Sequence, residues 1–262
     1  MPDIVEEGRV TQPETEDADA RSGGTGSARK ILTLLFSFSE YRRDATVAEL
    51  AETIGASVPT AYRLVALLKD MNLLEEGTRG RYHPTVKVMP LARAAQLASD
   101  IARVAAPIVE ETSRELRETV MLMQYFGDAA VCIELSESDR PMRFVFQRGH
   151  TLPLGRGASG KMVLASLPAK AQAAVLGRDG QLAGLESELS DIRARGYAVS
   201  RGEVDDGVWA CSAPVTLDDD RPVVLTAACP SARMSEDAKE RAIELVVRNA
   251  ARIRDALRPY SL

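Results

Sequence analysis

The sequence is poor in the residue types that build disulfide frameworks, metal sites and catalytic centres. Its three cysteines, at positions 132, 211 and 229, lie in apolar surroundings without CxxC spacing. An odd number in this pattern disfavours both disulfides and a zinc site. The two histidines, His83 and His150, have no carboxylate or cysteine at ligand spacing. We therefore expect no metal site, no catalytic residue and no cofactor.

The sequence also lacks long hydrophobic runs. None approaches the roughly 20 consecutive apolar residues of a membrane-spanning helix. Residues 1–28 carry seven acidic and two basic side chains, so they lack the positive start of a secretory signal. We expect no membrane partner and a cytoplasmic location. The formal net charge of −5 would by itself argue against nucleic acid as a partner.

That charge is unevenly distributed along the 262 residues. The acidic segment 1–28 ends in a Ser/Gly/Thr run and has the composition of a disordered tail. From Arg29 to Val88 the chain holds nine basic and seven acidic residues, and the remainder holds 22 basic and 24 acidic ones. The acidic total therefore hides a modestly basic segment.

Three amphipathic helices follow one another in this basic segment. Apolar residues recur there with the i, i+3, i+4, i+7 spacing of a helix face. The three sets are Ile31, Leu34, Leu35 and Phe38; Val47, Leu50, Ala51 and Ile54; and Ala61, Leu64, Val65 and Leu68. Thr46 and Ser57 are suited to cap the second and third helices, and Gly55 to turn between them. A hairpin with a basic tip is expected at 73–84, so residues 29–86 predict a winged helix-turn-helix.

The third helix is the one that such a domain inserts into the major groove of DNA. Once its apolar residues face the core, short polar and basic side chains remain outside, where they reach base edges and phosphates. The hairpin arginines would reach the adjacent backbone or minor groove. The candidate DNA-binding residues are Ser57, Thr60, Tyr62, Arg63, Arg79 and Arg81. The alternative interpretation is a small helical dimerisation module with a solvated face.

The rest of the chain alternates between helical and strand patterns. Residues 87–100 are rich in alanine and predict a linker helix. Residues 101–262 predict an α+β domain around an antiparallel or mixed sheet. We expect helices near 101–118, 158–176 and 181–195 and from Ser235 onward, and strands near 119–126, 129–135, 142–148, 197–201, 208–217 and 222–229.

A glycine-rich segment from Gly155 to Met162 matches the GxxxxGK pattern of a phosphate-binding loop. It places Met162 where that loop needs the hydroxyl of serine or threonine to bind magnesium. A nucleoside triphosphatase is therefore one interpretation. A second is a site for a small anion such as a carboxylate, held by backbone amides at the start of a helix. A third is a purely structural turn.

Taken together, these features resemble the IclR family of bacterial transcriptional regulators, from about Arg29 to Pro259. The resemblance rests on the helix-turn-helix 47–64, on Leu152-Pro153-Leu154, Gly160-Lys161, Arg195-Gly196-Tyr197-Ala198, Gly202-Glu203, Gly207 and Ser212-Ala213-Pro214-Val215. It implies a winged helix-turn-helix at 29–86, a linker helix at 87–100 and a GAF-like effector-binding domain at 101–262. The implied function is that of a ligand-responsive repressor of a catabolic operon, which binds double-stranded DNA at a palindromic operator as a homodimer or a dimer of dimers.

The resemblance also implies an effector site between the sheet and the glycine-rich loop, for a small organic acid or an aromatic compound. Carried over position by position, the site comprises Ala158, Ser159, Ser200, Ala210, Thr226 and Ala228. Ala210 stands where cysteine is frequent in the family, Ala228 where serine can occur, and Arg156 where a small or polar residue is usual. These departures imply a less polar pocket. The alternative function is a P-loop-like nucleoside triphosphatase, or another small-molecule enzyme, with an accessory helical domain.

Overall fold

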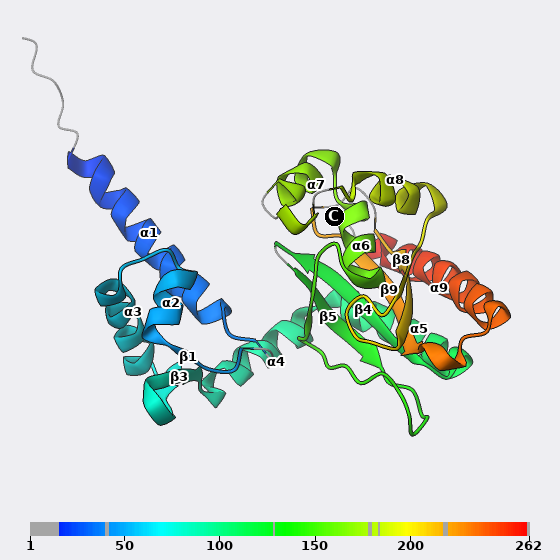
Figure 1. Cartoon of the computed structure of the whole chain (residues 1–262), viewed down its shortest axis with the longest axis horizontal. Helices are drawn as coiled ribbons and strands as arrows, with labels where there is room; N and C mark the ends of the chain where they lie inside the picture. The colour runs from blue at the N-terminus through cyan, green and yellow to red at the C-terminus, as the bar shows by residue number, and fades with distance from the viewer. Residues whose placement is uncertain are drawn as a thin grey trace, which may run out of the picture. The chain divides into compact units, whose positions relative to one another are not determined.

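The chain divides into two compact units, residues 1–90 and 91–262 (Figure 1). The structure is a computed structural model that describes residues 16–39, 42–127, 129–177, 180–182, 184–216 and 220–260. The division falls within the predicted linker segment 87–100, and each unit has an apolar core of its own.

The first unit is a winged helix-turn-helix, as the sequence predicts. Its elements are α1 (Glu16–Phe36), β1 (Ala45–Thr46), α2 (Val47–Thr53), α3 (Val58–Asp70), β2 (Leu74–Glu76) and β3 (Arg81–Pro84). The strands form an antiparallel sheet in the order β1-β3-β2. The apolar sets read from the sequence meet in one core, with Leu34, Leu50 and Leu68 among its buried members. The predicted cap of the second helix is present: the Glu49 amide donates to Thr46 Oγ1 over 3.3 Å.

Helix α1 begins earlier than the composition predicts. Residues 16–28, which the composition assigns to a disordered tail, form the N-terminal part of this 21-residue helix. The rest of the predicted tail, residues 1–15, lies outside the described residues.

The second unit is built around a six-stranded antiparallel sheet in the order β6-β5-β4-β9-β8-β7. The strands are β4 (Thr119–Phe126), β5 (Ala129–Ser136), β6 (Thr151–Pro153), β7 (Ala198–Arg201), β8 (Val208–Pro214) and β9 (Val223–Pro230). The helices are α4 (Met89–Ala98), which begins just before the division, α5 (Asp100–Leu116), α6 (Gly157–Ser166), α7 (Ala169–Leu176), α8 (Glu186–Arg195) and α9 (Glu236–Leu257).

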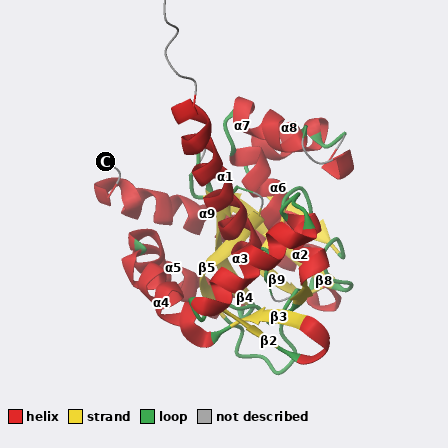
Figure 2. Cartoon of the chain, turned by 90° about the vertical axis from the view of Figure 1, so that its left-hand side faces the viewer, coloured by secondary structure: helices red, strands yellow, loops and turns green. Residues whose placement is uncertain are grey.

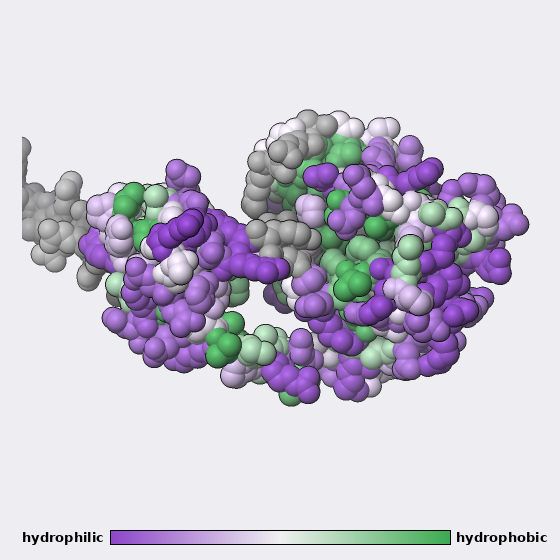
Figure 3. Space-filling model, turned by 60° about the horizontal axis from the view of Figure 1, so that its bottom comes forward, coloured by the Kyte–Doolittle hydropathy of each residue, from purple (hydrophilic) through white to green (hydrophobic). Residues whose placement is uncertain are grey.

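The sheet of this unit is covered on both faces. Helices α6, α7 and α8 lie on one face, and α5 and α9 lie on the other (Figure 2). Side chains alternate along each strand, so Val120 and Leu122 of β4 join the core under α5 and α9, whereas Met121 and Met123 join the core under α6. The face seen in Figure 3 is mostly hydrophilic, with apolar surface gathered toward the middle of the second unit.

Two predicted elements of this unit are wrong in detail. The segment 142–148, which the sequence predicts to be a strand, forms no strand and joins neither sheet. Side chains bond its carbonyl oxygens instead: Thr119 Oγ1 donates to Phe144 O over 2.6 Å. The strand that follows this segment in the chain is β6, which pairs with β5. The expected helix 158–176 is split into α6 and α7, because Pro168 lacks an amide hydrogen and forces the preceding residue into an extended conformation.

Among the helices of the described ranges, none combines the length and the apolar character that crossing a bilayer requires.

Candidate DNA-binding surface and effector pocket

The outer face of α3 carries most of the predicted DNA-binding residues. Ala61, Leu64, Val65 and Leu68 are buried, which leaves Ser57, Tyr62 and Arg63 exposed. The Ser57 and Thr60 hydroxyls lie 2.9 Å apart, and Arg63 Nη2 approaches Thr60 Oγ1 at 3.5 Å. Tyr62 is 56% exposed. These four side chains lie together on the outer face at the start of the helix, and that they contact DNA stays a prediction.

The two predicted arginines of the hairpin lie in different places. Arg79 is at the exposed tip, where it adopts a left-handed conformation with φ 60°, and it forms no ion pair within the described part of the chain. Arg81 is at the base. Its Nε lies 2.6 Å from Asp44 Oδ1 and its Nη2 lies 3.1 Å from Glu49 Oε2. Arg81 therefore joins the wing to the start of α2.

The charges at the base of the wing stabilise one another. The hydrogen bond to Asp44 raises the pKa of Arg81. The pKa of Glu49 is lowered, chiefly because its carboxylate accepts a hydrogen bond from the Thr46 amide and also because Arg81 lies beside it. That Arg81 contacts DNA stays a prediction, and its guanidinium is already engaged by two carboxylates.

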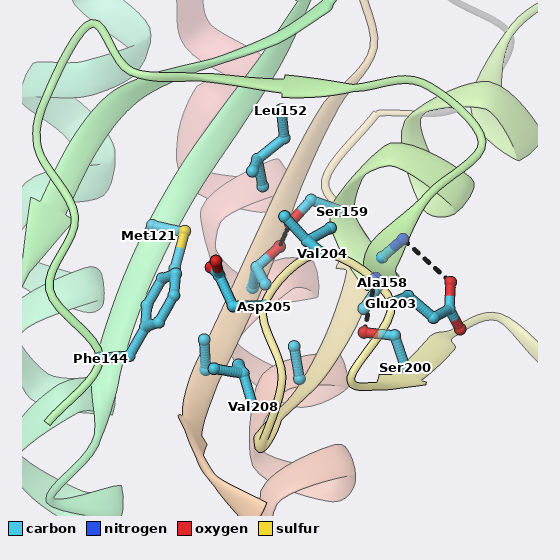
Figure 4. A pocket seen from close by; sticks show the side chains of 14 residues that line it. Met121, Phe144, Leu152, Ala158, Ser159, Ser200, Glu203, Val204, Asp205 and Val208 are labelled. Carbon is cyan, nitrogen blue, oxygen red and sulfur yellow. Dashed lines mark hydrogen bonds between the residues drawn. The ribbon is translucent and has the colours of Figure 1, made fainter. Parts of the chain in front are cut away.

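The six predicted effector residues line one cavity between the sheet and α6, with an empty volume of about 400 Å³ that includes its open mouth (Figure 4). The register of the sheet explains the grouping. Ser200 of β7 is opposite Ala210 of β8, and Ala210 is opposite Ala228 of β9. Thr226 lies two residues earlier on β9, on the same face. Small side chains at Ala210 and Ala228 leave the space open. That these residues bind an effector stays a prediction.

The start of α6 is already bonded to side chains from β7 and the loop after it. The Gly157 amide donates to Glu203 Oε2 over 3.0 Å, and the Ala158 amide donates to Ser200 Oγ over 2.9 Å. Ser159 Oγ lies 3.0 Å from Thr226 Oγ1, within a chain of buried hydroxyls (Figure 4). That this helix start binds a small anion stays a prediction, and the Glu203 carboxylate of the chain itself already accepts a hydrogen bond from the Gly157 amide.

Lys161 holds the same loop from inside the helix. Its side chain is 10% exposed, and its Nζ lies 2.7 Å from Glu188 Oε1 and 2.8 Å from Glu203 Oε1. Burial lowers the pKa of this lysine, but the two ion pairs outweigh burial and the net pKa is raised. Whereas the lysine of a phosphate-binding loop reaches a nucleotide, Lys161 joins α6 to α8 and to the loop at 202–207.

Sequence reasoning missed most of the cavity wall. The further lining residues are Met121, Phe144, Leu152, Gly157, Glu203, Val204, Asp205 and Val208. Strand alternation could have found Met121, because it lies opposite Thr226 on the neighbouring strand. No local pattern points to Phe144, which lies in the segment 142–148, outside the strands of the sheet. The loop residues Glu203 to Asp205 are bracketed by Gly202 and Gly207, which adopt positive φ.

The thiols are buried, as their apolar sequence context suggests. Burial raises the pKa of Cys132 and of Cys229 to about 12, and it raises the pKa of Cys211 further. Within the described residues, no three side chains of histidine, cysteine, aspartate or glutamate converge as metal ligands.

Comparison with known proteins agrees with both units. Residues 27–77 match the family model of the IclR helix-turn-helix domain, and residues 94–255 match that of the bacterial transcriptional regulator IclR C-terminal domain. The chain is 32% identical over 208 residues to the HTH-type transcriptional regulator Rv1719 of Mycobacterium tuberculosis, covering 76% of this chain and 80% of that protein.

Solved structures show the same fold. The crystal structure of an IclR family transcriptional regulator from Brucella abortus superimposes with a TM-score of 0.80 at 20% identity, covering 93% of this chain and 96% of that one. An IclR homolog from Microbacterium hydrocarbonoxydans, complexed with 4-hydroxybenzoate, superimposes with a TM-score of 0.64 at 19% identity, covering 89% and 99%. The chain therefore belongs to the IclR family of bacterial transcriptional regulators, and not to a family of enzymes.

Proposed function

We propose that this regulator represses a catabolic operon by binding a palindromic operator, and that a small organic effector in the cavity beside α6 changes its affinity for DNA. The observation that carries the proposal is the pairing of an exposed recognition surface on α3 with a partly apolar cavity in the second unit. An effector acts in this way when it binds one conformation better than the other. Since the DNA partner lies in the bacterial cytoplasm, we propose that the protein acts there.

Operator recognition is tested by fluorescence anisotropy with the DNA upstream of the protein's own gene. Arg63 is exposed and faces outward from α3, so we expect Arg63→Ala to weaken specific binding by about 1–3 kcal/mol, the range of a base contact. Arg114→Ala is the matched control, because replacing this exposed arginine of α5 removes the same charge from the second unit. If the native protein binds the upstream DNA no more tightly than random DNA at physiological salt, the proposal is contradicted.

Equal weakening of specific and random DNA by Arg63→Ala would instead assign this arginine to a phosphate. Arg79→Ala tests the wing in the same assay. Because Arg79 lies at the exposed tip without an acidic partner among the described residues, we expect it to weaken binding more than Arg81→Ala does in a protein that remains folded.

We propose that the operator-binding form is a homodimer or a dimer of dimers. Two-fold symmetric operators are read by two recognition helices, one from each copy. Helix α4 supports the proposal, because it has no buried residue and exposes Met89, Leu91 and Leu97 by 64%, 71% and 69%. Sedimentation of the native protein and of a Leu91→Asp, Leu97→Asp variant tests it. We expect the variant to sediment as a smaller species and to lose operator affinity, and a native monomer would refute the proposal.

The effector that we propose has an aromatic ring or a similar apolar body. Met121, Phe144, Leu152 and Val208 line the cavity with apolar surface, and a structural neighbour is complexed with 4-hydroxybenzoate. The sequence favours an organic acid held by the amides of α6. An acid bound there would have to displace Glu203 or Ser200, which already accept hydrogen bonds from these amides.

The effector site is tested by adding 4-hydroxybenzoate and related aromatic compounds to the complex of protein and operator. We expect at least one of them to change the anisotropy at fixed protein concentration. Ala228→Phe fills the cavity from β9 and should abolish the response. Ala251→Phe, at a half-buried position of α9, should not, because Ala251 does not line the cavity. An unchanged response in Ala228→Phe would move the effector elsewhere.

A further inference from the structure

The polar lining of the effector cavity is acidic. Among its lining residues, the side chains with formal charge are those of Glu203 and Asp205, both carboxylates. The two cations nearby, Lys161 and Arg156, already bond other groups of the protein. Lys161 Nζ pairs with Glu203 and Glu188, and Arg156 Nη2 donates to the backbone oxygen of Glu203 over 2.8 Å. Neither cation lines the cavity, and Lys161 offsets the charge of Glu203, so a carboxylate bound beside the loop would meet the uncompensated charge of Asp205.

The hydroxyls beside α6 also offer more acceptors than donors. Thr226 Oγ1 donates to Ser212 Oγ over 2.9 Å, so its contact with Ser159 is one in which Ser159 donates. The proton of Ser159 is then used, and its oxygen presents lone pairs. Ser200 Oγ accepts from the Ala158 amide and keeps one proton to donate. A ligand that brings hydrogen-bond donors therefore complements this lining better than one that brings acceptors.

Asp205 is the carboxylate that is free to meet such a donor. It lies on the loop between Gly202 and Gly207, and its backbone oxygen accepts from the Val208 amide over 3.2 Å. Within the described residues its carboxylate makes no hydrogen bond or ion pair, and in the empty cavity the residue is exposed to water. Figure 4 shows this carboxylate directed between Phe144 on one side and Ser159 on the other. Glu203, in contrast, is held by Lys161 and by the Gly157 amide.

The surroundings of Asp205 strengthen its preference. Phe144, Met121 and Val208 are apolar neighbours in the lining, and a ligand packed against them would exclude water from the carboxylate. A carboxylate that loses water requires a donor in its place, and a second carboxylate there is repelled. The loss of water and the repulsion between carboxylates both favour a ligand that brings a hydrogen-bond donor to Asp205.

We propose, on the basis of the function proposed above, that the effector presents a hydroxyl or ammonium group to Asp205, and that Asp205 selects against ligands with a free carboxylate at this end. The effector class is thus an aromatic or similarly apolar body with a hydrogen-bond donor, neutral or cationic at the end that meets the loop.

Three probes of matched shape test the inference: 2-phenylethanol, 2-phenylethylamine and phenylacetate, titrated into the full chain by calorimetry. We expect the alcohol and the amine to bind about 10-fold or more tightly than the acid, as a charge-assisted hydrogen bond replaces like-charge repulsion. Asp205→Asn should weaken the amine about 10-fold and improve the acid. Asp206→Asn is the control, because this neighbouring aspartate is exposed like Asp205 but does not line the cavity, and it should leave all three affinities within about twofold.

The outcomes separate this inference from the proposed function. Phenylacetate binding more tightly than the other two, or equal effects of Asp205→Asn and Asp206→Asn, overturns the donor inference and leaves the regulator function standing. Failure of all three probes to bind, in a protein that still binds its operator, counts against the cavity as the effector site and overturns the inference with it. Circular dichroism confirms that the variants are folded.

Discussion

Replacing Lys161 with methionine should destabilise the second unit by about 2–3 kcal/mol. The substitution keeps the length and apolar stem of the side chain and removes two hydrogen bonds, to Glu188 and to Glu203. A hydrogen bond to a charged group contributes about 1.5–3 kcal/mol. Lys161 is 10% exposed, but Glu188 and Glu203 are 43% and 30% exposed. Two such bonds would together contribute about 3–6 kcal/mol. Because water can reach both orphaned carboxylates, we place the loss below that sum, at about 2–3 kcal/mol.

The assay is urea unfolding followed by tryptophan fluorescence. The single tryptophan, Trp209, lies in β8 of the second unit and is 2% exposed, so its emission reports this unit. Glu188→Gln is the control, because it removes the more exposed partner, and we expect it to cost no more than about 1 kcal/mol. If Lys161→Met costs less than about 0.5 kcal/mol, within the range of ordinary surface substitutions, the view that Lys161 holds the loop at 202–207 is wrong.

Three further predictions concern packing and charge. Gly160→Ala places a Cβ 2.2 Å from the backbone oxygen of Pro153, so it should cost about 1–3 kcal/mol in the same unfolding assay, and an unchanged midpoint would contradict this packing. The three buried thiols should stay unreactive toward a thiol reagent at neutral pH until the protein unfolds, and rapid labelling of the native protein would show that burial does not protect them. The lowered pKa of Glu49 means that its stabilisation is full above the ordinary value of 4.5 and is lost as pH falls through the lower, folded value. In thermal melts of the helical signal, Glu49→Gln should therefore flatten the acid side of the profile, and an identical acid profile would exclude this role.

The DNA-binding unit follows from local sequence rules. Its helices are amphipathic, and its second helix has a capping box between Thr46 and Glu49. Local patterns also placed the outer face of α3, because the buried side is fixed by the spacing of Ala61 and Leu64. They did not reveal the role of Arg81, since its partners Asp44 and Glu49 lie 37 and 32 positions away in the chain.

Only part of the lining of the effector cavity could be predicted from the sequence. The resemblance to the family supplied six positions, and the sheet brings them together because Ser200, Ala210 and Ala228 are register partners. The sequence of a single strand does not predict this register, because the register depends on how the strands pair. Phe144 joins the wall from a segment that the β-rich composition assigns to a strand, and Asp205 joins it from a loop. Both positions depend on long-range contacts, such as the hydrogen bond from Thr119 to Phe144 O.

The cations of the DNA-binding unit divide into two groups with different consequences for binding. Lys69 and Arg81 bond acidic side chains of the same unit, Lys69 to Glu76 over 3.0 Å, and so they offer DNA little free charge. Arg63 and Arg79 are exposed and pair with no carboxylate in the described part of the chain. Counting basic residues therefore overstates the attraction for phosphates, and nonspecific binding, which depends on that attraction, should be weak and fade with salt. A second copy doubles the free cations on an operator and on random DNA alike. Specificity must then come from the base contacts of α3 and from the spacing of two recognition helices, which only a palindromic site satisfies at once.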